Sequence, residues 1–152
     1  MIRELVPEDR EAIEEALTEC GAFSEEEIRV ALELFDAGAP GGYTLFGAEI
    51  EGRVLGYVCL AQASLTQSSW YLYWICVHPA AQGKGVGRAL QAKSEEFVRS
   101  QGCRRLVLET SGRPDYCKAR RFYENAGYER VGLIPDFYRP GDDCAIYSKV
   151  IE

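Results

Sequence analysis

Gly83, Gly85 and Gly87 stand at alternate positions, and this spacing constrains the fold of the 152-residue chain more than any other feature. An apolar, strand-like run (70–77) precedes them and ends at Pro79, and a helix-like pattern follows them directly. Glycine permits positive φ angles and lets a ligand approach the backbone closely. The unpaired N–H groups at a helix start attract anions. The run therefore predicts a strand–loop–helix unit with a cradle for phosphate or pyrophosphate.

The spacing of these glycines excludes two common phosphate-binding motifs. No Gly-Lys pair is followed by Ser or Thr, as the P-loop requires, and the dinucleotide motif would put its third glycine at Arg88. What remains is Gln82-x-x-Gly85-x-Gly87. This pattern resembles the acyl-CoA pyrophosphate loop of the Gcn5-related N-acetyltransferase (GNAT) superfamily, whose signature is Q/R-x-x-G-x-G/A. A glycine-rich turn without a ligand is the alternative interpretation.

The resemblance implies that acetyl-CoA is the acetyl donor. In the superfamily, N–H groups of this loop hold the pyrophosphate, and N–H groups of the preceding strand, which splays away from its neighbour, face the acetyl oxygen. Carried over to this chain, the implied cofactor-binding residues are Ile75, Cys76 and Val77 on the strand and Gln82, Gly83, Lys84, Gly85, Val86, Gly87 and Arg88 in the loop.

A second stretch is similar to the other signature of the superfamily, N-x-x-A-x-x-F-Y-x-x-x-G-F/Y. Ala119, Phe122 and Tyr123 match it and share one helical face, and Gly127 provides the helix stop. The resemblance implies that these three side chains bind the cofactor and that Tyr123 points at its sulfur.

The chain departs from this signature at Tyr116, where the family usually carries Asn. In the relatives that Asn contacts the pantetheine arm or the sulfur region. Three side chains are candidates for the missing polar contact: Tyr116 itself, Asp115 and Ser111.

Hydrophobic patterning predicts seven strands and four helices in the order β-α-α-β-β-β-α-β-α-β-β. The expected strands are 2–6, 43–50, 53–63, 70–77, 106–109, 128–133 and 144–150, and the expected helices are 7–20, 24–37, 86–101 and 115–126. Residues 135–143 are expected to form loops. This is also the element order of GNAT proteins. The resemblance implies an α/β (α+β) fold with a central mixed, mostly antiparallel sheet.

Length and composition indicate one globular domain, residues 1–152, with 47% hydrophobic and 27% charged residues. No apolar run approaches the roughly 18 residues of a membrane helix, and the first residues do not resemble a signal peptide. The six cysteines lack metal-ligand or C-x-x-C spacing. We therefore expect a cytoplasmic protein with reduced thiols, without a metal site and away from membranes.

The net charge of −7 disfavours nucleic acid as a partner. Residues 1–36 hold twelve acidic and three basic residues, whereas residues 84–121 hold ten basic and four acidic residues. The basic segment suits an anionic cofactor. The acidic segment suits a cationic acceptor, although a solvated helical face explains it equally well.

Acetyl transfer to an amine makes two demands on side chains. An alkyl ammonium, with a pKa of about 10.4, costs about 4 to 5 kcal/mol to deprotonate at pH 7, so a base is needed. Glu109 is the nearest acid by topology, with Tyr73 and water relays as rivals and an ion pair with arginine as its structural alternative. Tyr123 is the candidate that stabilises the departing thiolate, with helix-to-sheet packing as its alternative. His78 is the only histidine, but it lies at the loop entrance, where the family's residue is variable.

The acceptor is expected to be a primary amine of a small molecule, amino acid or peptide N-terminus. Its pocket should involve Phe23 and Glu26 on one side and Phe137 and Tyr138 on the other, unless these aromatic residues only pack. Two alternatives stay open: a ribosomal-protein-type N-terminal acetyltransferase, and a non-catalytic acyl-CoA sensor. Homodimer formation is also possible through the terminal strands.

One further contact is left open by the sequence. Either Arg120 or Arg121 is expected to reach the 3′-phosphate of CoA, unless both are simply exposed helix charges.

Overall fold

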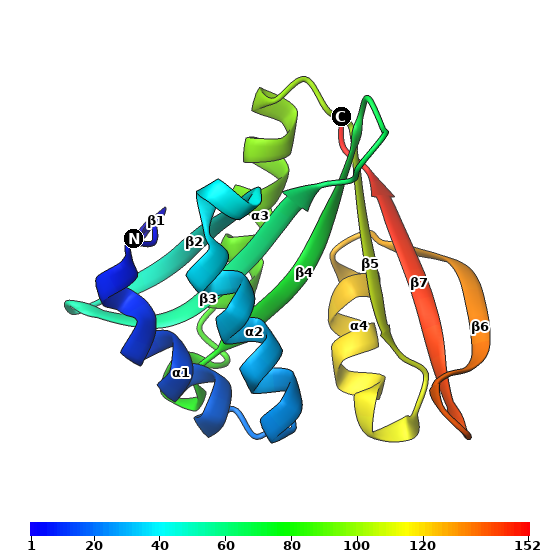
Figure 1. The fold of residues 1–152 in the computed structure, drawn as a ribbon, viewed down its shortest axis with the longest axis horizontal. Coiled ribbons are helices and arrows are strands. Elements are labelled where there is room, and N and C mark those ends of the chain that lie inside the picture. The colour runs from blue at the N-terminus through cyan, green and yellow to red at the C-terminus, as the bar shows by residue number, and fades with distance from the viewer.

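The computed structural model describes residues 1–152 as a seven-stranded sheet with helices on both faces (Figure 1). The strands are β1 (Ile2–Glu4), β2 (Tyr43–Ile50), β3 (Arg53–Gln62), β4 (Ser69–Val77), β5 (Arg105–Ser111), β6 (Glu129–Arg139) and β7 (Asp142–Val150). The helices are α1 (Arg10–Glu19), α2 (Glu25–Ala37), α3 (Val86–Ser100) and α4 (Cys117–Asn125). The predicted order of elements and the fold class are confirmed.

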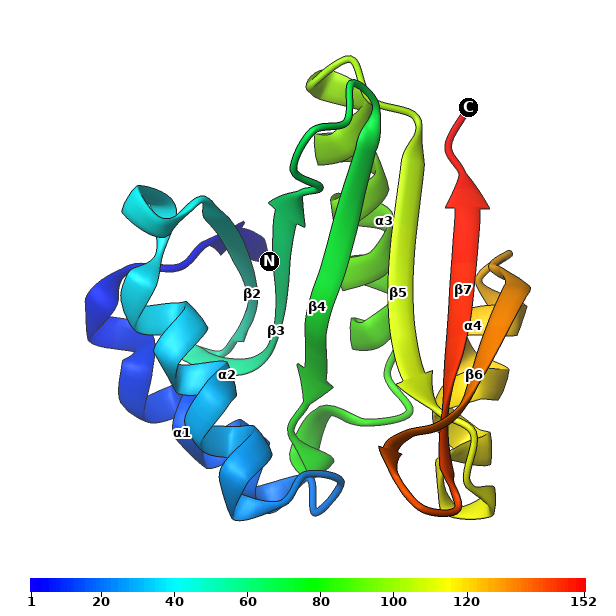
Figure 2. The ribbon, with the colours of Figure 1, turned by 45° about the vertical axis from the view of Figure 1, so that its right-hand side comes forward.

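The sheet has the strand order β1-β2-β3-β4-β5-β7-β6, and only β4 and β5 run parallel. These two strands pair only where Ser69–Tyr71 meets Arg105–Val107. Beyond that point they diverge toward the start of α3, as Figure 2 shows. The sheet is therefore split along part of its length, between its fourth and fifth strands.

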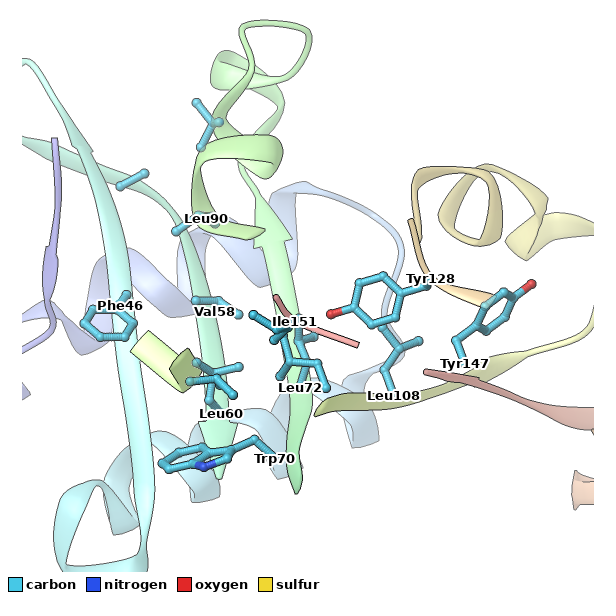
Figure 3. Close-up of a cluster of buried hydrophobic side chains, with 14 of the residues drawn as sticks. Phe46, Val58, Leu60, Trp70, Leu72, Leu90, Leu108, Tyr128, Tyr147 and Ile151 are labelled. Carbon is cyan, nitrogen blue, oxygen red and sulfur yellow. The ribbon is translucent and has the colours of Figure 1, made fainter. Parts of the chain in front are cut away.

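The helices divide the core into two clusters. α1 and α2 pack on β2, β3 and β4, where Ile13, Leu17 and Phe35 are buried. α3 and α4 lie on the opposite face, over a larger cluster, and the residues of this cluster that are labelled in Figure 3 include Leu60 and Leu90. Since α1 and α2 do not extend over β5, β7 and β6, that half of the sheet is open on one face (Figure 2).

Gly56 in β3 brings α3 close to the sheet. A Cβ atom at this position would lie 3.1 Å from the carbonyl oxygen of Cys76 and 3.2 Å from the side chain of Val86. Glycine inside a strand often marks such a close approach or a bulge. Both are present, since a bulge in the pairing of β2 with β3 lies next to Gly56.

Side chains and prolines set where the helices start. Ser24 and Glu27 form a capping box at the start of α2, with N–H to side-chain oxygen distances of 3.1 Å in both directions. Pro7–Asp9 is a 3₁₀ turn rather than the first turn of α1, and Pro114–Tyr116 likewise precedes α4. Proline fixes the backbone at both places, so the helices start three and two residues later than expected.

The prediction of loops at 135–143 was wrong. β6 extends to Arg139 and β7 begins at Asp142, so only two residues connect the strands. Pairing with β7 is nevertheless interrupted between Ile134 and Arg139. Asp136, at φ 55°, holds this arch in place: its N–H donates to Asp143 and its side chain accepts from the N–H of Gly141. The helices also lack the length and apolar character that crossing a membrane requires.

Candidate functional site

The loop between β4 and α3 leaves six consecutive backbone N–H groups, from Gly83 to Arg88, without a protein acceptor. The first hydrogen bond at this end of α3 runs from the Ala89 N–H to the Gly85 carbonyl, at 3.0 Å. Gly83 and Gly85 have φ angles of 76° and 80°, and a Cβ on either would meet open space. These amides therefore form an open, electropositive cradle of the predicted kind.

Two side chains of this loop hold its shape. The Gln82 amide donates to the carbonyl oxygen of Val77 at 3.0 Å, across the turn. His78 Nδ1 accepts from the N–H of Ala80 at 3.0 Å and caps the short 3₁₀ turn Pro79–Ala81. His78 thus has a structural role that explains its presence without a part in catalysis.

The structure brings the two sequence motifs into contact. A Cβ on Gly87 would lie 3.2 Å from the nearest ring atom of Phe122 and 3.8 Å from the side chain of Val77. Glycine at this position therefore lets α4 approach the start of α3 and the end of β4. The cradle, the end of β4 and the second motif therefore lie next to one another and together form the candidate site.

Tyr123 lies in this region with a free hydroxyl group. Its ring centroid is 5.9 Å from that of Tyr128 and 6.4 Å from that of Tyr147. Both neighbouring hydroxyls are engaged: Tyr128 accepts from Gln91 at 2.7 Å, and Tyr147 donates to Glu124 at 3.0 Å. Burial raises the pKa of Tyr123 to about 12, so it remains a neutral hydrogen-bond donor at physiological pH.

The predicted oxyanion strand lies on the parted edge of β4. Ile75, Cys76 and Val77 pair with β3 on one side, but beyond Tyr71 the other edge has no strand partner. N–H groups alternate between the two edges of a strand, so every second one is available to a ligand. The Cys76 thiol points elsewhere and donates to the carbonyl of Ala16. The neighbouring Cys20 thiol and burial raise the Cys76 pKa, so Cys76 remains a thiol.

The other residues of the second motif occupy different surroundings. Ala119, Phe122 and Tyr123 lie partly buried, as a shared helical face requires. Tyr116 is at the start of α4, and its pKa is raised by burial and by the carboxylates of Glu27, Asp115 and Asp142.

The basic residues around the cradle differ in whether their side chains already have a partner within the protein. Lys84 and Arg88 are exposed at the start of α3 and form no ion pair within the protein. Arg120 donates to the carbonyls of Ser111 and Arg113, at 2.8 and 2.7 Å, and so anchors α4 to the end of β5. Arg121 is exposed and has no such partner.

Glu109 is exposed on β5 and forms no salt bridge with a lysine or arginine. Arg105 donates to Ser148, Arg113 pairs with Asp115, and Arg139 pairs with Asp142. The ion pair weighed for Glu109 from the sequence is therefore absent. No group of three or more His, Cys, Asp or Glu side chains is arranged to hold a metal ion.

Two hollows lie away from this region. One of about 450 Å³ lies between α1 and α2, where Arg10 pairs with Asp36 and Arg29 with Glu33. Another of about 210 Å³ lies near Gly127, beside β6 and β7. Neither contains the cradle, Tyr123 or Glu109. The candidate site is therefore identified by backbone N–H groups and side chains that lack a hydrogen-bond partner in the protein, and not by a large cavity.

Comparison with known families agrees with this geometry. The sequence profile described as Acetyltransferase (GNAT) family matches residues 10–128, a range that contains the cradle and the second motif. The chain belongs to the GNAT acetyltransferase family. Members of this family use acetyl-CoA as acetyl donor.

Two GNAT relatives are similar over part of their length. An uncharacterized N-acetyltransferase of Methanocaldococcus jannaschii is 33% identical over 103 residues, 67% of this chain and 63% of that protein. N-alpha-acetyltransferase RimI of Mycobacterium tuberculosis is 33% identical over 94 residues, 61% of this chain and 56% of that protein. The chain thus matches less than two thirds of the length of these curated relatives.

Solved GNAT structures confirm the fold. A GNAT-family protein from Desulfovibrio desulfuricans matches 100% of this chain and 99% of its own, with a TM-score of 0.96 and 38% identity. The ribosomal-protein-S18-alanine N-acetyltransferase from Escherichia coli matches 100% of this chain and 94% of its own, with a TM-score of 0.80 and 22% identity. The second likeness shows the fold alone.

Tyr73 was named from the sequence, but the two tyrosines beside it, on the face of the sheet that carries α1 and α2, were not. Tyr43 and Tyr71 lie beside Tyr73, with ring centroids 6.0 and 5.4 Å from it. The alternation of Tyr71 and Tyr73 was a visible signal that both face the same side of a strand. Tyr43 joins them through strand pairing, which no local pattern reveals.

Proposed function

We propose that the protein transfers the acetyl group of acetyl-CoA directly to a primary amine of a small molecule, an amino acid or a peptide N-terminus. The observation that carries this proposal is the set of six free N–H groups at residues 83–88, adjoining a parted strand edge and the free hydroxyl of Tyr123. A diphosphate, a thioester carbonyl and a thiolate need these three kinds of donor. Family membership supports the same activity.

The amides of residues 83–88 would hold the diphosphate of acetyl-CoA, with Lys84 and Arg88 adding positive charge. When bound, acetyl-CoA supplies an activated acetyl group. The free N–H groups around Ile75, Cys76 and Val77 would donate to the acetyl oxygen as negative charge develops there. Because these donors belong to a strand held by β3, they need little rearrangement during the reaction.

Tyr123 would donate a hydrogen bond to the departing sulfur and keep its proton. Complete transfer from a phenol of pKa about 12 to a thiolate of pKa about 8.5 is uphill by about 5 kcal/mol. A hydrogen bond avoids this cost.

Glu109 would remove the proton of the acceptor amine, directly or through water. Its carboxylate has no arginine or lysine partner, so it is available for this role. The tyrosine weighed as its rival stays protonated at neutral pH and so cannot accept the proton: burial and the nearby Tyr43, Tyr71, Cys59 and Glu109 raise the pKa of Tyr73. Glu109 is thus the better candidate of the two.

Two further cofactor contacts are part of this proposal. Arg121, rather than Arg120, would reach the 3′-phosphate, because the Arg120 guanidinium is already bound to two carbonyls. Ala119 and Phe122 would line the pantetheine arm, with Tyr116 or Ser111 making the polar contact that Asn makes in relatives. The Ser111 hydroxyl is bonded to Asp142, which leaves Tyr116 as the freer donor.

N-terminal protein acetylation is the second candidate function. The relative named N-alpha-acetyltransferase is 33% identical over 94 residues, and α1 and α2 do not cover β5, β7 and β6 (Figure 2). The six free cysteines fit a reducing cytoplasmic setting for either function.

The test is thiol release from acetyl-CoA over a panel of amines, amino acids and short peptides. We expect release with at least one class of amine and none without an acceptor. CoA binding without release on any acceptor would contradict the enzyme function and favour an acyl-CoA sensor. Preference for peptides over all small amines would establish the second candidate.

A further inference from the structure

Three tyrosines from two strands form one aromatic surface on the face of the sheet that carries α1 and α2. Tyr43 in β2 and Tyr71 in β4 both pair with Ala61 of β3, whose small side chain separates them. Tyr73 joins them from a bulge, because β3 pairs with Leu72 and Trp74 but skips it. The Tyr73 ring is tilted against Tyr71 and edge-on to Tyr43. We refer to Tyr43, Tyr71 and Tyr73 as the tyrosine cluster.

Glu109 lies across the split of the sheet from this cluster. Tyr71 is the last residue of β4 that pairs with β5, and its partner is Val107. Two residues further along each parallel strand are Tyr73 and Glu109, on the same face as Tyr71 and Val107. If pairing continued they would be neighbours, but the strands have begun to part. Tyr73 and Glu109 therefore flank the opening of the split.

A fourth tyrosine lies on the other side of β5. Tyr138 is on the arch of β6, and its hydroxyl is 3.8 Å from Cys144 Sγ, on the strand next to β5. Burial, Cys144 and Glu109 raise the pKa of Tyr138. Tyrosines thus lie on strands to either side of β5, which carries Glu109.

Glu109 carries a carboxylate that forms no salt bridge with a lysine or arginine. Arg105, Arg113 and Arg139 contact Ser148, Asp115 and Asp142 instead. Aromatic faces attract ammonium groups, and a negative field concentrates cations near the surface. An anionic acceptor would be repelled by the carboxylate, and an apolar acceptor would gain only apolar contact with the rings.

We propose that the tyrosine cluster and Glu109 select an acceptor that carries a second positive charge, such as a diamine. One amine enters the split and is acetylated. The other, still protonated, lies against the tyrosine rings near Glu109. This inference rests on the proposed acetyltransferase function and names the chemical class of its acceptor.

The test compares two acceptors of equal length, 1,5-diaminopentane and 1-aminopentane, with kcat/KM measured for each by thiol release. We expect the unaltered protein to prefer the diamine by about tenfold or more, mainly through a lower KM, and added salt to reduce the preference. A ratio near one would overturn the inference while leaving the acetyltransferase function intact. Release with neither amine nor any other acceptor, despite CoA binding, would refute the function and the inference together.

Variants of Glu109 and Tyr73 test whether these residues cause the preference for the diamine. Glu109→Gln removes the charge at constant shape, and Tyr73→Leu removes one ring; each should lower the preference to about threefold or less. Tyr73→Phe keeps the ring and should keep the preference. Because a ratio between two acceptors cancels any loss of turnover common to both, it separates recognition of charge from proton removal by Glu109. An unchanged ratio in both Glu109→Gln and Tyr73→Leu would overturn the assignment.

Discussion

In the proposed enzyme, the two faces of the split sheet would bind their ligands by different means. On the face of α3 and α4, the site is built from backbone: free amides at residues 83–88, a strand edge, and glycines that permit close packing. On the face of α1 and α2, it is built from side chains, namely the tyrosine cluster and Glu109. A backbone site tolerates little change in geometry, whereas a side-chain site changes with single substitutions. The fold can therefore keep one cofactor while its acceptor varies.

The largest effect on turnover is expected at Tyr123 in α4. Tyr123→Phe should lower kcat by tenfold or more, about 1.4 kcal/mol, and leave CoA affinity unchanged, because only the donor to the sulfur is lost. Steady-state kinetics and CoA titration measure the two quantities. Tyr147→Phe is the matched control, since its hydroxyl is held by Glu124. An unchanged kcat in Tyr123→Phe would remove this residue from the mechanism.

A second prediction tests the contact between α3 and α4. Gly87→Val adds atoms where a Cβ would already lie 3.2 Å from Phe122, and overpacking costs about 1 to 3 kcal/mol. CoA affinity should fall roughly tenfold. In the double variant with Phe122→Leu, part of this loss should be recovered, and titration of the four proteins gives the coupling. Strictly additive losses would mean that the two motifs do not act as one site.

A third prediction separates the two arginines of α4. Arg121→Gln should weaken CoA binding about fivefold and abolish the preference for CoA over 3′-dephospho-CoA, because a charge-assisted phosphate contact is lost. Arg120→Gln should instead lower thermal stability, since it removes bonds to Ser111 and Arg113. Titration with both ligands and thermal unfolding distinguish them. If Arg120→Gln weakened CoA binding and Arg121→Gln lowered thermal stability instead, the roles assigned to the two arginines would have to be exchanged.

The smallest effect is expected at the cap of α2. Ser24→Ala removes the acceptor of the Glu27 N–H and should cost about 1 kcal/mol of unfolding free energy. Denaturant unfolding measures this cost. CoA affinity should not change, because α2 lies on the acceptor face. A change in CoA affinity larger than twofold would show that the two faces are coupled.

The cofactor face was largely predictable from sequence, because local signals specify it. Gly85 marks a left-handed backbone position, and Phe122 and Tyr123 follow helical periodicity within one short stretch. The acceptor face was not predictable to the same degree. The bulge at Tyr73, the end of pairing at Tyr71 and the arch of β6 depend on contacts between distant strands, which no local pattern encodes.

The central claim is that free amides at the start of α3 grip the diphosphate of CoA. Calorimetric titration of CoA into the unaltered protein, Gly85→Glu and Gly102→Glu tests it most directly. Both glycines have positive φ angles, 80° and 74°, and open surroundings, so the two substitutions strain the backbone alike. We predict one-to-one binding for the unaltered protein and Gly102→Glu, and at least 100-fold weaker binding for Gly85→Glu, about 2.7 kcal/mol or more. Equal affinity of Gly85→Glu and the unaltered protein, or no heat from any of the three, would contradict the account.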